Sequence, residues 1–295
     1  MKRKKSSVTI TGIIYLLPAL IFVIGFNVIP FVWNMILSLQ NWNGFSQAEF
    51  VGLENFKAVL ADSAFLHSLW NSILYAACST VGGVLLGLVL ATFIYKLGDK
   101  EGSVFRLILY SPAMVPTAVV GLMFVFFFNP EMGLLNNFLK IIGLESLQHV
   151  WLQDKATAMA CLVFVAIWKC AGSVMMMCFA SMQTLPPSLY ESAKLDGASF
   201  WQQMFQITYP LIKPMILLST INTLGSQYKS YDLIQTMTQG GPGNLTSTVP
   251  IIMTKTAFTY GKFGRAAAQG VIFTVIVAIS IILVRRVLRS EEYEY

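Results

Sequence analysis

The chain has 295 residues, of which 56% are hydrophobic and only 12% are charged. A soluble domain carries about 25% charged residues, so this chain has too little polar surface for a water-soluble body. The length suffices for about six membrane spans of ~20–25 residues with short loops, and it excludes an additional large soluble domain. The net charge of +6 does not indicate a nucleic-acid partner, because the basic residues are distributed by membrane side.

The amino terminus predicts a retained first span. Residues 1–9 carry a basic cluster, and an apolar run follows at about 10–39. This run is longer than the apolar region of a signal peptide and lacks a small-residue cleavage site, which favours a span preceded by a basic cytoplasmic tail. Pro18 and Pro30 predict kinks inside it. Beyond it, residues 50–65 are typical of a short amphipathic helix at the outer surface.

Five further apolar stretches have the length of a membrane span. With the first, the predicted spans are about 10–39, 69–95, 107–128, 156–182, 211–236 and 266–287, within a transmembrane domain at 10–287. Three glycines in the second span predict close helix packing. Pro112 and Pro116 predict an irregular third span. An outer amphipathic helix is expected between the third and fourth spans, and an acidic cytoplasmic tail at 288–295.

The apolar spans predict an all-α membrane protein, and the charge distribution supports the placement of both termini in the cytoplasm. Twelve of the 20 Lys and Arg residues fall in predicted inner segments and six fall in predicted outer segments. This excess of inner positive charge is typical of an even number of spans with cytoplasmic ends.

A polar segment at 186–210 separates the fourth and fifth spans. Ser188–Glu191 and Ser199–Gln202 have the spacing of capping boxes, which predicts a helix beginning at each serine. Gly197 suits the left-handed residue that ends the first of these helices. Pro210 is expected to stop or kink the second helix.

Polar side chains in the fourth and fifth spans are candidates for a substrate pathway. An ionisable residue at membrane depth costs at least ~2.5–3.5 kcal/mol on insertion scales, so it needs a partner or a water-filled cavity. Lys229 and Asp232, three residues apart, could form a local ion pair, whereas Lys169 could extend to one membrane interface. The candidate pathway residues are Trp168, Asn222, Gln227, Tyr228, Lys229, Tyr231 and Asp232. The methionine cluster Met175–Met177 with Met182 is either adaptable core packing or a flexible gate.

The sequence contains no evident catalytic chemistry. All four cysteines lie in apolar segments without metal-ligand spacing, and there is no phosphate-binding GxxxxGK loop or catalytic triad. An ion-coupled secondary transporter that uses Lys169, Lys229 and Asp232 as relay charges remains an alternative, although no internal repeat is evident.

Two motifs carry a resemblance to a known family. Glu191-Ser192-Ala193, followed by Gly197, Ile207 and Pro210, resembles the EAA loop of ABC importer permeases; Ser192 and Tyr209 depart from that pattern. Tyr231-Asp232 followed by Thr238-x-Gly240-Gly241-Pro242 resembles carbohydrate-importer permeases, as does the run Val51-Gly52-Leu53 with Asn55-Phe56 ahead of Asn71. The resemblance extends over about residues 15–284.

The resemblance implies a six-helix permease subunit of a type I ABC importer, similar to maltose, multiple-sugar and glycerol-phosphate permeases. Such a subunit would move a sugar or oligosaccharide across a bacterial cytoplasmic membrane. Its implied partners are a second permease, two ATPase subunits that bind ATP and Mg, and an extracytoplasmic solute-binding protein; no cofactor is implied for this chain. The residues implied to couple to the ATPases are Glu191, Ser192, Ala193, Asp196, Gly197 and Ala198.

Overall fold

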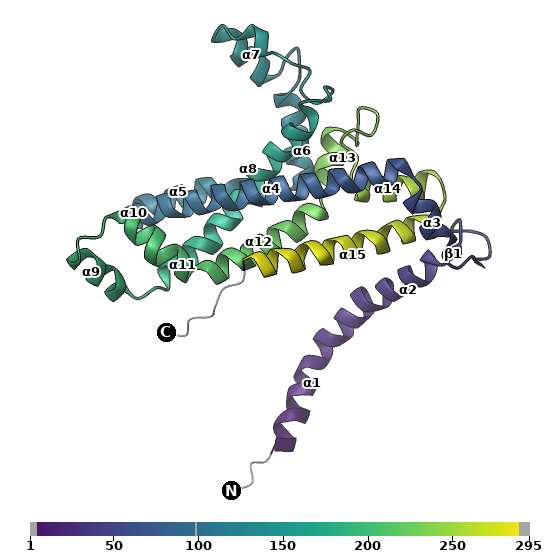
Figure 1. Cartoon of the computed structure of the whole chain (residues 1–295), viewed down its shortest axis with the longest axis horizontal. Helices are drawn as coiled ribbons and strands as arrows, with labels where there is room; N and C mark the ends of the chain where they lie inside the picture. Colours follow the sequence, from purple (N-terminus) through teal and green to yellow (C-terminus); the bar gives the residue numbers. More distant parts are fainter. Residues whose placement is uncertain (1–4, 98, 289–295) are drawn as a thin grey trace. The chain divides into compact units, whose positions relative to one another are not determined.

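Helices make up nearly all the regular structure of the chain (Figure 1). The computed structural model describes residues 5–97 and 99–288. The parts of the predicted basic and acidic tails at 1–4 and 289–295 lie outside the described residues. The only strands in the described chain, β1 (Gln40–Asn41) and β2 (Glu49–Phe50), form an antiparallel pair with Gln40 opposite Phe50. The chain divides into two compact units.

The first unit comprises Met1–Phe65 and Met253–Thr274. Its helical elements begin with α1 (Lys5–Val23), a π-helical turn (Ile24–Val28), α2 (Ile29–Ser38) and α3 (Glu54–Leu60). The π-helical turn accommodates Pro30 without interrupting the long apolar segment Tyr15–Ser38. Asn55 Nδ2 donates to the carbonyls of Ser38 and Gln40 at 3.0 and 2.9 Å, so α3 is held to the end of α2.

The second unit comprises Leu66–Ile252 and Val275–Tyr295. Its elements are α4 (Ser63–Lys96), α5 (Asp99–Met114), α6 (Thr117–Phe127), α7 (Leu134–Ile141), a 3-10 turn (Glu145–Leu147), α8 (Ala158–Gln183), α9 (Pro187–Leu195), α10 (Phe200–Gln203), a π-helical turn (Met204–Thr208), α11 (Tyr209–Leu211), α12 (Lys213–Tyr228), α13 (Asp232–Met237), α14 (Val249–Thr254) and α15 (Phe263–Val287). The first unit shares α4, α14 and α15, and it also contains a π-helical turn at Lys255–Thr259.

Four helical segments of the described chain are long and apolar enough to span a membrane, and the number rises to six if each of two bent helix pairs is one span. The four are Tyr15–Ser38, α4, α8 and α15. In the two bent pairs, α5 meets α6 at 95° and Phe200–Leu211 meets α12 at 67°. The prediction of six spans therefore holds if each bent pair is one span. The third and fifth spans are then broken helices.

The break in the third span lies at Val115–Pro116, between α5 and α6. Pro112 lies inside α5, whereas Pro116 precedes the first residue of α6 with an extended ψ of 136°. Because proline has no N–H and disfavours a helical residue before it, the chain turns at Pro116.

The fifth span differs from its prediction as a single helix at 211–236. It turns at Ile212, so Pro210 does not end the preceding helix as expected, and it breaks again at Lys229–Tyr231. Lys229 and Asp232 consequently belong to different helices, and no ion pair joins them. The predicted local ion pair is wrong, because the helix is interrupted between these two residues. At this break Tyr75 of α4 contacts Ser230, and the spacing of residues in the sequence does not reveal that contact.

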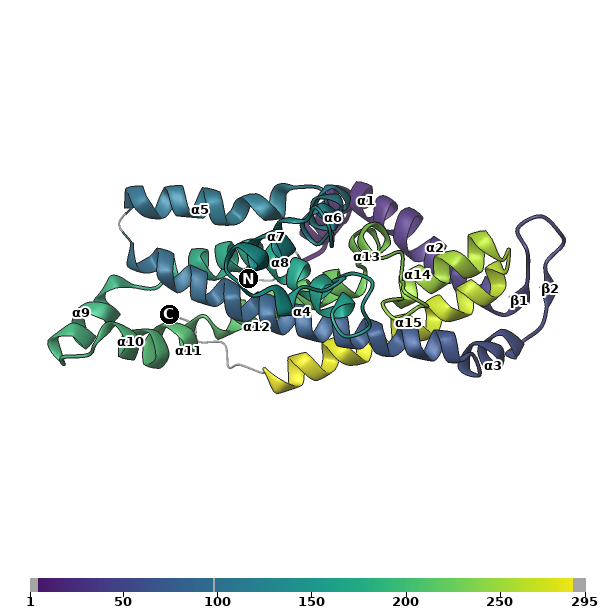
Figure 2. The ribbon, with the colours of Figure 1, turned by 90° about the horizontal axis from the view of Figure 1, so that it is seen from above.

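Small residues bring the long helices together, as predicted for the second span. A Cβ added at Gly87 would lie 2.6 Å from Cβ of Val174, and Gly82 and Gly83 face Ile167 and Cys170 as closely. Figure 2 separates α4 and α5, which overlap in Figure 1. Met175 and Met182 are buried in the core that α4, α5 and α8 share, which favours packing over a gate for these two methionines.

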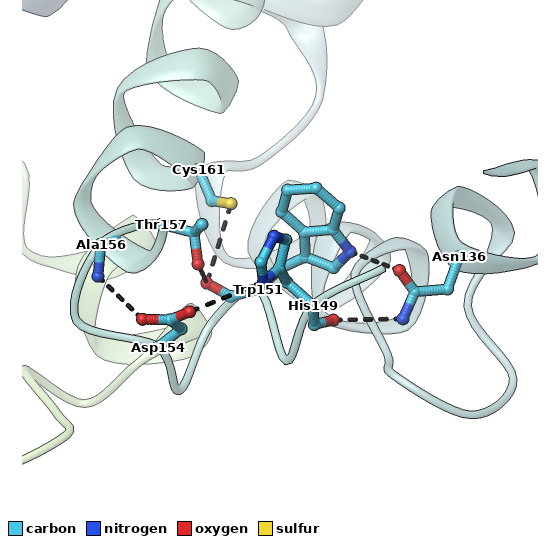
Figure 3. A network of polar contacts seen from close by, with 7 residues as sticks. All are labelled: Asn136, His149, Trp151, Asp154, Ala156, Thr157 and Cys161. Carbon is cyan, nitrogen blue, oxygen red and sulfur yellow. Dashed lines mark hydrogen bonds and ion pairs between the residues drawn. The ribbon is translucent and has the colours of Figure 1, made fainter. Parts of the chain in front are cut away.

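The segment between α6 and α8 is ordered by Asn136 (Figure 3). Its side-chain amide donates to the carbonyls of Pro130 and His149 at 3.0 and 3.1 Å, and its oxygen accepts from the indole of Trp151 at 2.7 Å. Thr157 in turn donates to the Trp151 carbonyl at 2.6 Å. These contacts attach α7 to the start of α8 and leave the apolar stripe of α7 exposed.

Candidate functional site

The segment between α8 and α12 folds as two short helices joined by a glycine bend. Figure 1 shows α9 and α10 at one end of the second unit, and α7 lies at the opposite end of α8. The N–H of Ala198 donates to the Ala193 carbonyl at 2.9 Å and that of Gly197 to the Lys194 carbonyl at 3.1 Å. With a φ of +79° at Gly197, these bonds form the predicted left-handed helix end.

One of the two predicted capping boxes is present. Ser199 Oγ accepts from the N–H of Gln202, and Gln202 Oε1 accepts from the N–H of Ser199 at 2.7 Å. The box predicted at Ser188 is wrong, because α9 begins one residue earlier, at Pro187, without a side-chain cap. Proline is well suited to the first helical position, where its missing N–H would lack a partner in any case.

The two short helices are fastened to the long ones by side-chain contacts. Tyr190 Oη of α9 and Thr208 Oγ1 share a hydrogen bond of 3.0 Å, and Thr92 Oγ1 of α4 and Tyr209 Oη share one of 2.8 Å. The Lys96 ammonium lies 5.5 Å from the centre of the Phe200 ring. These contacts connect α9 to the π-helical turn Met204–Thr208, and they connect α4 to α10 and α11.

The residues predicted to couple to the ATPases gather on this segment. Glu191, Ser192, Asp196 and Gly197 are exposed, Ala198 is half-buried and Ala193 is buried. Leu195 is 90% exposed at the end of α9.

A cavity of about 400 Å³ lies among α4, the α5–α6 bend, α8 and the α12–α13 break. It is lined by most of the candidate pathway residues together with further polar groups. The predicted residues among its lining are Asn222, Gln227, Lys229, Tyr231 and Asp232. The residues that sequence reasoning did not select include Tyr75, Thr117, Ser173, Ser226 and Ser230.

Two candidate pathway residues lie away from this cavity. Trp168 packs against the hydrophobic core that α6, α8 and α13 share, with its ring 5.3 Å from that of Phe124. Tyr228 is buried and its hydroxyl shares a hydrogen bond of 2.9 Å with Ser280 of α15. Trp168 is adjacent to Lys169, and Tyr228 is adjacent to Gln227, and both of these neighbours line the cavity. Because successive residues of a helix point in different directions, only one residue of each pair faces the cavity.

Helix α4 holds the end of the fifth span beside the cavity. Tyr75 Oη and Ser230 Oγ lie 3.1 Å apart at the α12–α13 break. One turn away, Asn71 Nδ2 donates to the carbonyls of Leu245 and Ser247, each at 2.9 Å. The spacing of Asn71 and Tyr75 on one helix face is the signal that would have identified Tyr75 as a lining residue.

The Thr-x-Gly-Gly-Pro motif forms the loop that Asn71 holds. Thr238 Oγ1 and Thr246 Oγ1 lie 2.8 Å apart, and Thr246 donates to the Gly241 carbonyl at 2.6 Å. Gly240 has a φ of +83°, and a Cβ there would lie 3.2 Å from Ser247. This motif therefore builds the loop between α13 and α14 and does not line the cavity.

A helical membrane protein with a cavity between its spans that polar side chains partly line, and with two short helices exposed at one end, has the architecture of a transport component. Residues 83–291 match the family described as binding-protein-dependent transport system inner membrane component, and the chain belongs to this family. It is therefore a multi-pass inner-membrane protein, the permease component of an ABC importer, with no catalytic role of its own. This membership contradicts the alternative of an ion-coupled secondary transporter.

The relatives cover nearly the whole chain. The chain is 38% identical over 272 residues to the probable ABC transporter permease protein YurN of Bacillus subtilis, covering 92% of each. It is 33% identical to the diacetylchitobiose uptake system permease protein NgcF of Streptomyces coelicolor, covering 94% of this chain and 82% of that protein.

Solved structures confirm the permease fold. The chain superposes on a bacterial ABC transporter involved in the import of the acidic polysaccharide alginate with a TM-score of 0.82, at 23% identity, covering 98% of this chain and 99% of that one. A second structure with a TM-score of 0.82, at 22% identity, is a bacterial alginate ABC transporter in complex with an alginate pentasaccharide-bound periplasmic protein. As a family member, this chain works in an importer complex with a binding protein and ATPase subunits.

Proposed function

We propose that the chain is one of two related permease subunits through which an importer moves a sugar or oligosaccharide across the bacterial cytoplasmic membrane, with both termini inside the cell. The observation that carries this proposal is the chemistry of the cavity. Its lining combines the planar amides of Asn222 and Gln227, several hydroxyl groups, and the rings of Tyr75 and Tyr231. Such a combination of apolar wall and few convergent polar groups suits a hydroxyl-rich ring.

The names of relatives support a saccharide as the substrate class. One relative is named for diacetylchitobiose and the structural neighbour for alginate, both of which are chains of sugar rings. The Lys229 ammonium and the Asp232 carboxylate, both exposed at the cavity wall, add charged groups that can bind sugar hydroxyls.

The proposed cycle begins when an extracytoplasmic binding protein delivers the sugar to the outer face. ATP and Mg bind to two ATPase subunits, which close on α9 and α10 at the inner face. The Tyr190–Thr208 hydrogen bond passes this displacement to the π-helical turn that leads into α11, and the Thr92–Tyr209 bond passes it from α11 to α4, which lines the cavity. Hydrolysis then resets the spans. In this scheme Glu191, Ser192, Ala193, Asp196, Gly197 and Ala198 form the contact with an ATPase.

Alanine substitutions in the cavity test the pathway. In the reconstituted importer, Asn222→Ala and Gln227→Ala should each reduce sugar-stimulated ATP hydrolysis, because each removes an amide from the cavity wall. Assembly with the ATPases should be unchanged. Tyr228→Phe is the matched control, since Tyr228 neighbours Gln227 but directs its hydroxyl to Ser280. Unchanged stimulation in both alanine variants would remove these residues from the pathway.

A further inference from the structure

Lys169 places a charge in the middle of a membrane-spanning helix. α8 runs from Ala158 to Gln183, so Lys169 lies ~16 Å from one end of the helix and ~21 Å from the other. Those distances are too long for the ammonium to reach either membrane interface. The side chain instead crosses to a neighbouring segment, where Lys169 Nζ donates to the Val115 carbonyl at 2.9 Å.

The Val115 carbonyl needs a donor because the third span is broken there. α5 ends at Met114, α6 begins at Thr117 and the two helices are bent by 95°. The last carbonyls of a helix have no N–H partner within it, and Pro116 supplies none. These carbonyls also carry the negative end of the helix dipole, which favours a nearby cation. In a membrane, an unpaired carbonyl is costly unless it meets protein or water.

The packing of α5 against α8 explains why Lys169 reaches this break. One turn further along α8, a Cβ added to Gly172 would lie 2.5 Å from the Leu109 carbonyl and 3.0 Å from Cα of Tyr110. The two backbones are therefore nearly in contact at this turn. Lys169 points along the same interface toward the end of α5.

The bend that Lys169 contacts forms one wall of the cavity. Ala113 on the α5 arm and Thr117 on the α6 arm both line it, as does Lys169 itself. A single hydrogen bond at Val115, between the two arms, therefore influences the position of both. The other charged groups that face the cavity are Lys229 and Asp232, on the α12–α13 side.

We propose that Lys169 is a positioning residue for transport: its ammonium bonds the elbow between α5 and α6 to α8 and thereby fixes the wall that Ala113 and Thr117 form. The role is exercised through the backbone of the elbow and does not require contact with the cargo. It goes beyond the proposed sugar pathway, because the contact would hold the elbow whatever molecule crosses the membrane.

The test measures the elbow directly in the assembled importer. Spin labels are attached through unnatural amino acids at Leu107 on α5 and Phe126 on α6, which are 68% and 72% exposed. This choice leaves the four native cysteines in place. Lys169→Met and Lys169→Gln remove the charge, and Lys169→Arg retains a cation that can donate. Lys229→Met is the control, because Lys229 lines the cavity without contacting the elbow.

In the wild type and Lys169→Arg, the distance between the labels should have one narrow distribution. Both neutral variants should broaden it, and uptake should fall about tenfold, as expected for loss of one charge-assisted hydrogen bond. Lys229→Met should leave the distance unchanged. The proposal is overturned if the neutral variants keep the wild-type distribution, even when uptake falls, since Lys169 would then act on the cargo. It is also overturned if Lys169→Arg behaves as the neutral variants do.

Discussion

Gly197 ends α9 in the left-handed conformation, and replacing it by valine tests whether the bend itself is needed for coupling. Its φ is +79°, and a Cβ built there meets no atom within 4 Å. The added Cβ therefore meets no obstacle within the chain, so the direct effect of the substitution on α9 comes from the backbone conformation. The left-handed conformation costs an L-residue roughly 1–2 kcal/mol, and a β-branched residue is a particular outlier there.

That cost shifts the local equilibrium away from the bend by about 5- to 30-fold. The chain provides a control with the same geometry. Gly143, at the end of α7, has a φ of +76°, and a Cβ built there also meets no atom within 4 Å. Its own N–H and that of Leu144 donate to carbonyls three and five residues earlier, as the N–H groups of Gly197 and Ala198 do. Gly143→Val imposes the same backbone strain at the other end of the second unit.

The assay reconstitutes each variant with its ATPases in proteoliposomes and measures ATP hydrolysis and uptake together. Gly197→Val should hydrolyse ATP with little uptake, because α9 no longer holds the angle at which it engages the ATPase. Gly143→Val should keep the two activities coupled. Normal uptake by Gly197→Val, or equal uncoupling by Gly143→Val, would refute this reasoning.

Three stability predictions concern other contacts. Ser199→Ala removes the capping box of α10 and should destabilise it by about 1 kcal/mol, measured as faster proteolysis within the inner segment; an unchanged rate would contradict the cap. Asn71→Ala leaves two loop carbonyls without their donor and should lower the melting temperature of the purified complex by an amount equivalent to about 1–3 kcal/mol. Gly172→Ala should separate α5 from α8 and also lower the melting temperature, whereas Gly225→Ala, whose Cβ meets no atom within 4 Å, should not; equal melting temperatures would argue against the close approach.

Structural features that depend on residues close together in the sequence could be predicted from it. The glycine bend at Gly197 and the cap at Ser199 follow from spacing, and both are present. The cap at Ser188 failed because Pro187 competes for the start of the same helix. The close packing of the second span also follows from composition, since only small residues allow helices to approach in lipid.

The breaks within spans and the directions of side chains could not be predicted from one sequence. The α12–α13 break lacks proline, and Tyr75, some 155 positions earlier in the chain, bonds to its Ser230. Gln227 and Tyr228 are both polar and adjacent, yet only Gln227 lines the cavity. Helix rotation decides between them, and it is set by the packing of α12 against its neighbours.

The central claim is that α9 and α10 are the part of this permease that an ATPase engages. A photo-crosslinking amino acid at Leu195, which is 90% exposed, tests it directly in membranes containing the whole importer. The same reagent at Ile141 on α7, 83% exposed, is the control at the opposite end of α8. The account predicts a crosslink to an ATPase subunit from position 195 and none from position 141. A crosslink from position 195 to the extracytoplasmic binding protein, or no ATPase adduct there, would contradict it.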